Sequence, residues 1–282
     1  MSLCSCCPCT LIIGAILTFA VYKFFCCRKR CRKQPEILEK NFQKDVVYLY
    51  QFPHYRTIPN ISPYCLKIET FLRLNKIKYE NRYTLTKRSV HGLLPFIELN
   101  GEQIGDSQII EEKLKKHFDI KTVYEEENTV GRAARCLISH HTSPIMIKYK
   151  MIDETEDTVD YFYEVAGLPS FLNCLKPLAI WYFKRVGTKR VKNGLGLFSD
   201  SDFDMLLRKD LDVVNGLLGE RNFLLGNKIS NTDASIFGHI ATWYYMPKKS
   251  RVANILDEDY KPIVEWMERV KKELFAEDFE HN

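Results

Sequence analysis

Acidic residues are missing from the first 33 positions, and a basic excess is missing from the rest of the chain. Of the 41 lysines and arginines, six lie in those 33 positions, which leaves 35 basic residues against 36 acidic ones. A nucleic-acid-binding surface needs a local excess of basic residues on the folded part of a protein. The charge balance therefore argues against a nucleic-acid partner.

Charge is also absent in front of the longest apolar run, Leu11 to Phe25, which only Lys23 interrupts. Extended to Cys9 and Cys27, the run holds 19 residues, about 28 Å as a helix against roughly 30 Å of membrane hydrocarbon. A cleaved signal peptide carries its positive charge in front, whereas here a basic cluster follows at residues 28–33. Residues 1–33 are predicted to be a membrane anchor, with the following domain facing the cytoplasm.

Cysteines are scarce outside this segment: only Cys65, Cys136 and Cys174 of the ten lie beyond position 33. Three cysteines in a cytosolic domain exclude a disulfide framework. The remaining seven are candidates for two kinds of chemistry. S-palmitoylation is favoured for the juxtamembrane Cys26, Cys27 and Cys31, and thiolate metal binding is a weaker hypothesis for Cys4, Cys6, Cys7 and Cys9.

Residues 34–44 read as a polar linker, and residues 45–122 as a small α/β domain. Strands are predicted at 46–50, 79–83, 96–99 and 102–104 and helices at 62–75 and 107–118. Asn100-Gly101 marks a hairpin turn between the last two strands. A short polar connection, residues 84–92, follows the second strand.

Ser62-Pro63-Tyr64-Cys65 stands between the first strand and the first helix of this domain. The helix N-terminus would stabilise an anion or thiolate beside Ser62 or Cys65. The plainer interpretation is that Ser62 caps the helix and Pro63 starts it. Cys65 lies one turn inside the helix and is expected to be buried.

Residues 123–282 read as a helical domain. Helices are predicted at 132–151, 161–172, 177–191, 202–218, 233–246 and 262–275. Ser230-Asn231-Thr232-Asp233 has the spacing of a capping box at the start of one of them. The aromatic clusters 161–163 and 181–183 are expected to pack in the core, with an apolar substrate site as the alternative.

This order of motifs resembles the glutathione transferase superfamily. The features are Ser-Pro-Tyr-Cys opening a helix, Leu94-Pro95-Phe96-Ile97 before a hairpin, and Asp106-Ser107 before the next helix. The resemblance implies a thioredoxin-like N-terminal domain followed by a helical glutathione-transferase-like C-terminal domain. Within the superfamily, the chain looks most similar to the membrane-anchored branch of failed axon connections, nematode cadmium-responsive proteins and metaxins.

The resemblance also implies roles for individual residues. Ser62 takes the thiol-activating position, with Cys65 as the alternative. Leu94 and a cis-Pro95 help to bind glutathione as co-substrate, and Asp106-Ser107 holds its γ-glutamyl end. Ser230 and Asp233 form the structural capping box.

Two functions remain open at this point. The first is a membrane-anchored transferase-like protein that handles thiols or small electrophiles in a stress or cadmium response. The second is a non-catalytic adaptor of the metaxin or failed axon connections type, with protein partners. Ser62 with Asp106-Ser107 favours the first function, and the short 84–92 connection favours the second.

Overall fold

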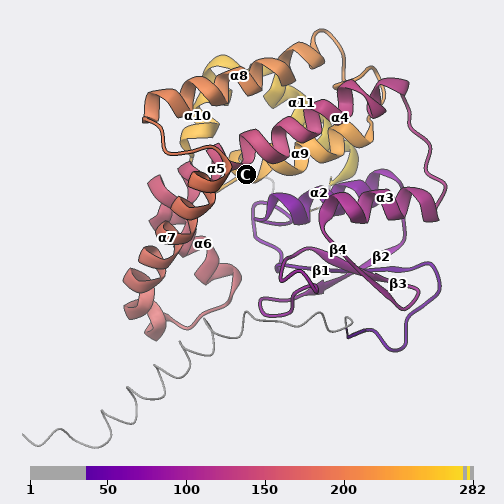
Figure 1. Ribbon diagram of the computed structural model, residues 1–282, viewed down its shortest axis with the longest axis horizontal. Helices are drawn as coiled ribbons and strands as arrows, with labels where there is room; N and C mark the ends of the chain where they lie inside the picture. Colours follow the sequence, from indigo (N-terminus) through magenta and orange to yellow (C-terminus); the bar gives the residue numbers. More distant parts are fainter. Residues whose placement is uncertain (1–35, 276–277, 280–282) are drawn as a thin grey trace, which may run out of the picture. The chain divides into compact units, whose positions relative to one another are not determined.

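The computed structural model describes residues 36–275, 278 and 279 (Figure 1). The predicted anchor, the palmitoylation candidates and the N-terminal cysteine cluster lie outside these residues. Among these described residues, no helix combines the length and apolar character that a membrane crossing requires.

A mixed four-stranded sheet forms the N-terminal half, in the order β2-β1-β3-β4. β1 and β2 run parallel, while β3 is antiparallel to both β1 and β4. The strand bounds are β1 Val47–Gln51, β2 Tyr79–Tyr83, β3 Phe96–Leu99 and β4 Glu102–Gly105. The predicted strands are thus confirmed, with the first shifted by one residue. Asn100 and Gly101 both adopt positive φ in the β3–β4 turn, as a tight hairpin of this type requires.

Two helices, α2 (Pro63–Leu74) and α3 (Ser107–His117), cover one face of this sheet (Figure 1). Alternate strand residues such as Val47, Leu49 and Ile97 point toward them and are fully buried, because successive side chains of a strand face opposite sides. No helix lies between β2 and β3, in agreement with the short connection. The sheet and these two helices confirm the thioredoxin-like prediction.

The segment before β1 packs on the opposite face of the sheet. The backbone N–H groups of Leu38 and Glu39 donate to the buried Glu98 carboxylate at 2.9 and 2.8 Å. Tyr50 and Phe96 stack beneath them at 4.5 Å between ring centroids. Part of the stretch predicted as a linker is therefore a packed element of the domain.

Helices make up the rest of the described chain. They are α4 (Val130–Cys136), α5 (Ser143–Lys148), α6 (Thr155–Val165), α7 (Lys176–Gly194), α8 (Asp200–Leu218), α9 (Asn231–Tyr244), α10 (Arg251–Asp259) and α11 (Lys261–Leu274). Two π-helical stretches, Leu137–Thr142 and Tyr149–Asp153, join α4 to α5 and extend α5. Short 3-10 segments occur at Glu125–Asn128 and Ser170–Leu175.

Two helix predictions were wrong. The helix expected at 161–172 begins six residues earlier and ends at Val165, because Gly167 with positive φ and Pro169 terminate it. α10 was missed, although Ser250 caps it by accepting from the N–H of Ala253 at 3.1 Å. Only nine residues long, α10 is too short for a clear helical period.

The capping box at the start of α9 is confirmed. Asp233 Oδ2 accepts from the Ser230 N–H at 2.9 Å, and Ser230 Oγ accepts from the Asp233 N–H at 3.4 Å. Asp233 Oδ1 also accepts from Leu224 N and from Trp266 Nε1, both at 2.8 Å. Burial raises the pKa of this carboxyl group, and these donors oppose the rise. The box therefore joins three separate segments of the helical core.

The two halves meet where α2 crosses α9. A Cβ atom on Gly238 would lie only 2.4 Å from Lys67 Cα and 2.5 Å from Lys67 N, so the crossing requires glycine. Leu66 belongs to the helical core, whereas Ile68, two residues further along α2 and on its opposite side, belongs to the sheet core. α2 is thus shared by both cores.

Candidate functional site

Three predicted site segments converge at one edge of the sheet. Phe96, which follows the cis Leu94–Pro95 bond, pairs with Tyr50 near the end of β1 and with Gly105 at the end of β4. The end of β1 leads to Ser62, and the end of β4 leads to Asp106. The fold therefore brings the sequence motifs of Ser62, Pro95 and Asp106-Ser107 to the same edge.

Ser62 begins α2, but its hydroxyl makes no capping hydrogen bond to the first turn. Its own N–H donates to Asn60 Oδ1 at 3.0 Å, and its carbonyl accepts from Leu66 N at 3.0 Å. The side chain is partly exposed and interacts with the Cys65 thiol. The plain capping interpretation therefore does not account for the Ser62 hydroxyl.

Cys65 is fully buried, as its place inside the helix suggested. Loss of hydration raises the pKa of its thiol to about 12, despite opposing hydrogen bonds from Ser62 and the Phe52 backbone. A thiol with this pKa stays protonated at neutral pH and is a poor nucleophile. Ser62 is consequently the better candidate of the two.

Asp106 has the unusual backbone angles φ 73° and ψ 125° for a residue with a side chain. Its Oδ1 accepts from the N–H groups of Gln108 at 2.9 Å and Ile109 at 3.3 Å and thereby caps α3. Ser107 beside it is buried. Backbone strain of this kind concentrates at ligand-binding turns.

Arg88 is a residue of this edge that sequence reasoning missed. It lies in the connection between β2 and β3, with its guanidinium 5.5 Å from the centre of the Phe52 ring. Burial lowers its pKa, the nearby Cys65 thiol is protonated and uncharged at neutral pH, and no carboxylate neutralises Arg88 among the described residues. Neighbouring Ser89 lies against Gly105, where an added Cβ would come within 2.8 Å of it. The connection that lacks a helix thus supplies a cation to the site.

The helical half contacts the Ser62 segment from the other side. Lys150 donates to the carbonyl of Ile61 at 3.2 Å, and the Tyr64 hydroxyl lies 3.3 Å from that of Ser143. Burial lowers the pKa of Lys150 to about 8, and its ammonium lies 4.9 Å from the centre of the Trp243 ring. No sequence motif marked Lys150.

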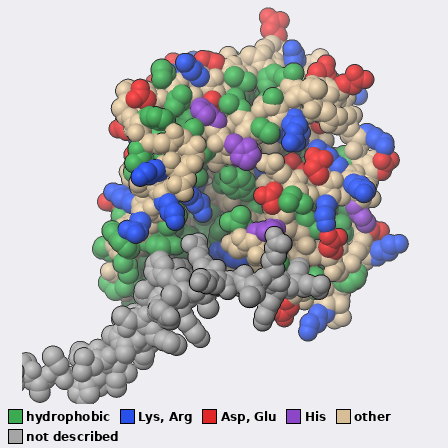
Figure 2. Space-filling model, viewed as in Figure 1, with side chains coloured by type: hydrophobic (Ala, Val, Ile, Leu, Met, Phe, Trp, Pro, Cys, Tyr) green, Lys and Arg blue, Asp and Glu red, His purple; other side chains and the backbone are tan. Residues whose placement is uncertain are grey.

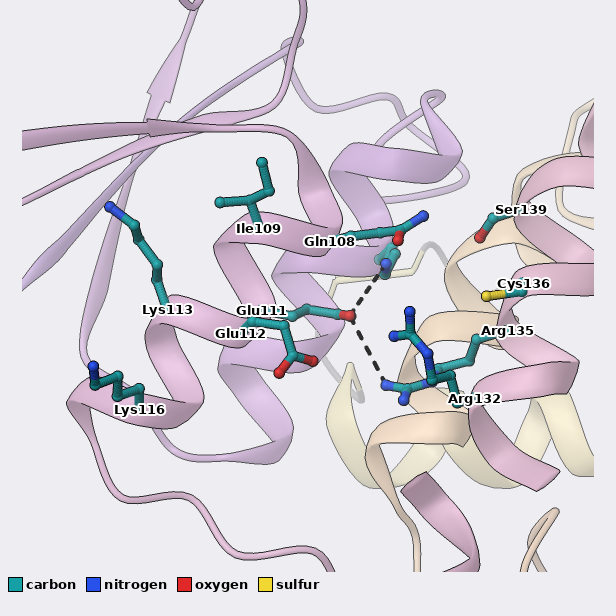
Figure 3. Close-up of a pocket in the computed structure, with 11 residues that line it drawn as sticks. Gln108, Ile109, Glu111, Glu112, Lys113, Lys116, Arg132, Arg135, Cys136 and Ser139 are labelled. Atoms are coloured by element: carbon teal, nitrogen blue, oxygen red, sulfur yellow. Dashed lines mark ion pairs between the residues drawn. The ribbon is translucent and has the colours of Figure 1, made fainter. Parts of the chain in front are cut away.

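A cavity of about 450 Å³ opens between α3 and α4, one residue beyond Ser107 (Figure 3). Lys67 and Glu111 form a buried ion pair at 3.2 Å at its floor. Arg135 lies 4.0 Å from the same carboxylate, as the dashed lines of Figure 3 show. Glu111 Oε1 is buried without a hydrogen-bond partner in the described part of the chain. The cavity borders the Asp106-Ser107 turn through Gln108.

Metal-ligand clusters of three or more His, Cys, Asp or Glu do not occur within residues 36–275, 278 and 279. The adjacent His140 and His141 face different partners, Gln108 at 3.0 Å and Asp210 at 2.7 Å. The N-terminal cysteines proposed for metal binding or acylation lie outside these residues.

Both halves match glutathione transferase families. Residues 63–156 match the family described as glutathione S-transferase N-terminal domain, and residues 207–270 match glutathione S-transferase, C-terminal domain. The fold agrees with a glutathione transferase of Phanerochaete chrysosporium at a TM-score of 0.57 and 14% identity, over 81% of this chain and 97% of that one. The chain belongs to the glutathione transferase superfamily.

Within the superfamily it belongs to the branch of Failed axon connections. It is 35% identical to that Drosophila melanogaster protein over 223 residues, which are 74% of this chain but only 52% of the fly protein. It is also 25% identical to the isoprene-epoxide glutathione S-transferase of Rhodococcus sp. (strain AD45), over 77% of this chain and 94% of that protein. A transferase of Ceriporiopsis subvermispora that was solved with glutathione has a TM-score of 0.55 at 17% identity, over 80% of this chain and 97% of that one.

Proposed function

We propose that this chain binds glutathione at the sheet edge formed by Ser62, Leu94-Pro95 and Asp106-Ser107, and that it uses the bound thiol against small electrophiles. The observation that carries the proposal is the convergence of these three motifs beside Arg88, a cation that no carboxylate of the described residues neutralises. Glutathione carries two carboxylates and a thiol, so a partly buried arginine suits it.

In the proposed reaction the glutathione thiol loses its proton to solvent, and the Ser62 hydroxyl donates a hydrogen bond to the resulting thiolate. The N-terminus of α2 adds a favourable dipole at the same point. The thiolate then forms a carbon–sulfur bond with an electrophilic carbon, from which the leaving group departs or at which an epoxide ring opens. Cys65 takes no part because its thiol remains protonated.

The cellular role and the membrane attachment are further parts of the proposal. By its resemblance to that branch, the protein handles electrophiles or thiols in a stress or metal response, cadmium included. Residues 1–33 hold it to a membrane through the apolar run and acylated Cys26, Cys27 and Cys31, with the folded part facing the cytoplasm. Glutathione binding and conjugation can be tested separately from these points.

Calorimetric titration with glutathione tests the site. Arg88→Gln removes the charge and is expected to weaken binding about tenfold, the usual effect of losing one charge-assisted hydrogen bond. Lys87→Gln is the matched control, because Lys87 is the exposed neighbour in the same connection. Equal affinities of the two variants would show that Arg88 does not contact glutathione.

A second measurement addresses the thiolate. Ser62→Ala is expected to bind glutathione nearly as well as the natural chain but to raise the pKa of the bound thiol, which ultraviolet absorbance of the thiolate reports. Asp106→Asn, which retains a capping side chain, separates loss of charge from loss of the α3 cap. Absence of binding at millimolar glutathione would refute the proposed site altogether.

The alternative is a non-catalytic adaptor. The absence of a helix between β2 and β3 favours it, because this connection gives the edge fewer side contacts for a tripeptide. Glutathione binding without conjugation of any tested epoxide or aryl halide would support the adaptor function.

A further inference from the structure

The segment between the two family matches carries an exposed apolar and basic surface. The matched ranges end at residue 156 and resume at residue 207, so α7 and most of α6 lie between them. Residues 165–199 contain six lysines and arginines and no acidic residue. This local excess contrasts with the near-neutral composition of the chain beyond position 33.

One side of α7 packs against the protein. Val191 is fully buried, and a Cβ on Gly187 would lie 2.7 Å from Met151 Cβ, so this side of the helix closely approaches the π-helical stretch that follows α5. Residues spaced by three and four positions share one helical stripe. The stripe opposite Gly187 and Val191 therefore faces away from the body.

We call this outward stripe and the 3-10 turn before it the α7 face. It comprises Phe171, Leu175, Leu178 and Trp181 at one end and Arg185, Lys189 and Lys192 at the other. Phe171 is 75% exposed, Leu178 62% and Trp181 55%, so Trp181, unlike the half-buried Tyr182 and Phe183, departs from the expectation that the aromatic cluster 181–183 packs in the core. Figure 2 shows hydrophobic and basic side chains gathered where α7 lies in Figure 1.

The charges of the α7 face are largely free to meet a partner. Lys176, which lies beside the α7 face, is paired with Asp160 of α6 at 2.7 Å. The Arg185 guanidinium lies 5.7 Å from the centre of the Trp181 ring, and no carboxylate pairs with Arg185, Lys189 or Lys192 within the described ranges. The face thus combines exposed Trp, Phe and Leu with uncompensated cations.

We propose that the α7 face docks on an anionic lipid surface. Helices that lie in the membrane interface pair Trp, Phe and Leu with Lys and Arg in this way, and anionic headgroups complement a basic stripe without acidic neighbours. The apolar end enters the interface while the basic end contacts headgroup phosphates. The proposal is independent of the glutathione site and of the predicted N-terminal anchor.

Trp181 is a built-in reporter for the test. The chain has three tryptophans, and the other two, Trp243 and Trp266, are 4% and 0% exposed. The full-length protein is mixed with phosphatidylcholine vesicles, with or without about a third phosphatidylserine, each containing brominated lipid. Quenching of fluorescence then reports contact between Trp181 and lipid even if residues 1–33 also insert.

Strong quenching is expected only in the anionic vesicles, and Trp181→Phe is expected to abolish it. Each basic residue near an anionic surface contributes about fivefold to binding, so Lys189→Gln with Lys192→Gln should shift the docking equilibrium of Trp181 by about 25-fold. The matched pair Lys209→Gln with Lys228→Gln, two exposed lysines outside the α7 face, should leave it within about twofold.

Three results would overturn the proposal. The first is the absence of quenching in either kind of vesicle, and the second is equal quenching in both. The third is shielding of Trp181 that appears without lipid as the protein concentration rises, and that Leu178→Ser abolishes. The last result would assign the α7 face to self-association. Circular dichroism of each variant verifies folding, which substitutions at exposed positions should preserve.

Discussion

Acid sensitivity centred on His239 is the first prediction. His239 lies on α9 with 1% of its surface exposed, and its ring meets the Tyr64 ring edge-on at 5.2 Å. Nδ1 lies 2.9 Å from the Ser235 carbonyl, and Nε2 has no hydrogen-bond partner among the described residues. Burial, reinforced by the positive charge of Lys67, lowers the pKa of His239 to about 4 from 6.5. The folded protein therefore keeps this ring neutral.

The sign of the effect follows from this lowered pKa. As pH falls below 6.5, the unfolded chain takes up a proton that folded His239 does not take up until about pH 4. The stability that neutral His239 contributes is therefore fully present above the unfolded pKa of 6.5 and is lost as the pH falls from 6.5 to about 4. Linkage gives a loss of about 2 kcal/mol between about pH 7 and 5, approaching about 3 kcal/mol below pH 4.

The assay compares the natural chain with His239→Gln, which has a similar volume and no proton to gain. Urea titrations at several pH values give the free energy of unfolding of each protein. The variant's stability relative to the natural chain should rise by about 2 kcal/mol as pH falls from about 7 to 5. His91→Gln, at an exposed histidine, is the control. A pH-independent difference between His239→Gln and the natural chain would refute this reasoning.

Two further predictions concern the crossing of α2 with α9 and the ion pair beside it. Gly238→Ala should lower the free energy of unfolding by about 3 kcal/mol or more, because its Cβ meets backbone atoms of Lys67. Gly216→Ala, in open space on α8, should instead raise the free energy of unfolding by about 0.5–1 kcal/mol. Equal effects of the two substitutions on thermal unfolding would contradict the crossing geometry. Lys67→Met alone should lower the free energy of unfolding by up to about 3–5 kcal/mol, because Glu111 then stays buried with only Arg135, at 4.0 Å, opposite it; adding Glu111→Leu should recover most of that loss. A double variant as unstable as the single one would show that the buried charge is not the cause.

Local chemistry explains which elements could be predicted from the sequence. Asn100-Gly101 defined the hairpin, and Ser230 with Asp233 defined the start of α9, because each signal lies within a few residues of the element it controls. The boundary of α6 was misplaced, although Gly167 and Pro169, which end the helix, also lie within a few residues of it.

In the candidate site, too, some residues could be predicted from the sequence and others could not. Ser62, Pro95 and Asp106 stand at ends of predicted elements, and the family resemblance assigned them to one site before the strand order was known. Lys150 reaches Ile61 across 89 positions, and Arg88 gains its place from packing on Phe52 rather than from any local pattern. Contacts of this range depend on the tertiary fold and leave no periodic signal in the sequence.

The sharing of α2 between the two cores limits how the site can move. Leu66 is anchored among the helices and Ile68 among the sheet residues, and Gly238 holds the backbone of α9 against this same turn. A hinge between the halves would have to pull α2 out of one core, so rotation of one half against the other is not available for admitting a ligand. The connection between β2 and β3, which carries Arg88, is a loop, and loops are segments that move on the nanosecond to microsecond scale. Entry to the site is therefore expected to be controlled by the same loop that supplies its cation.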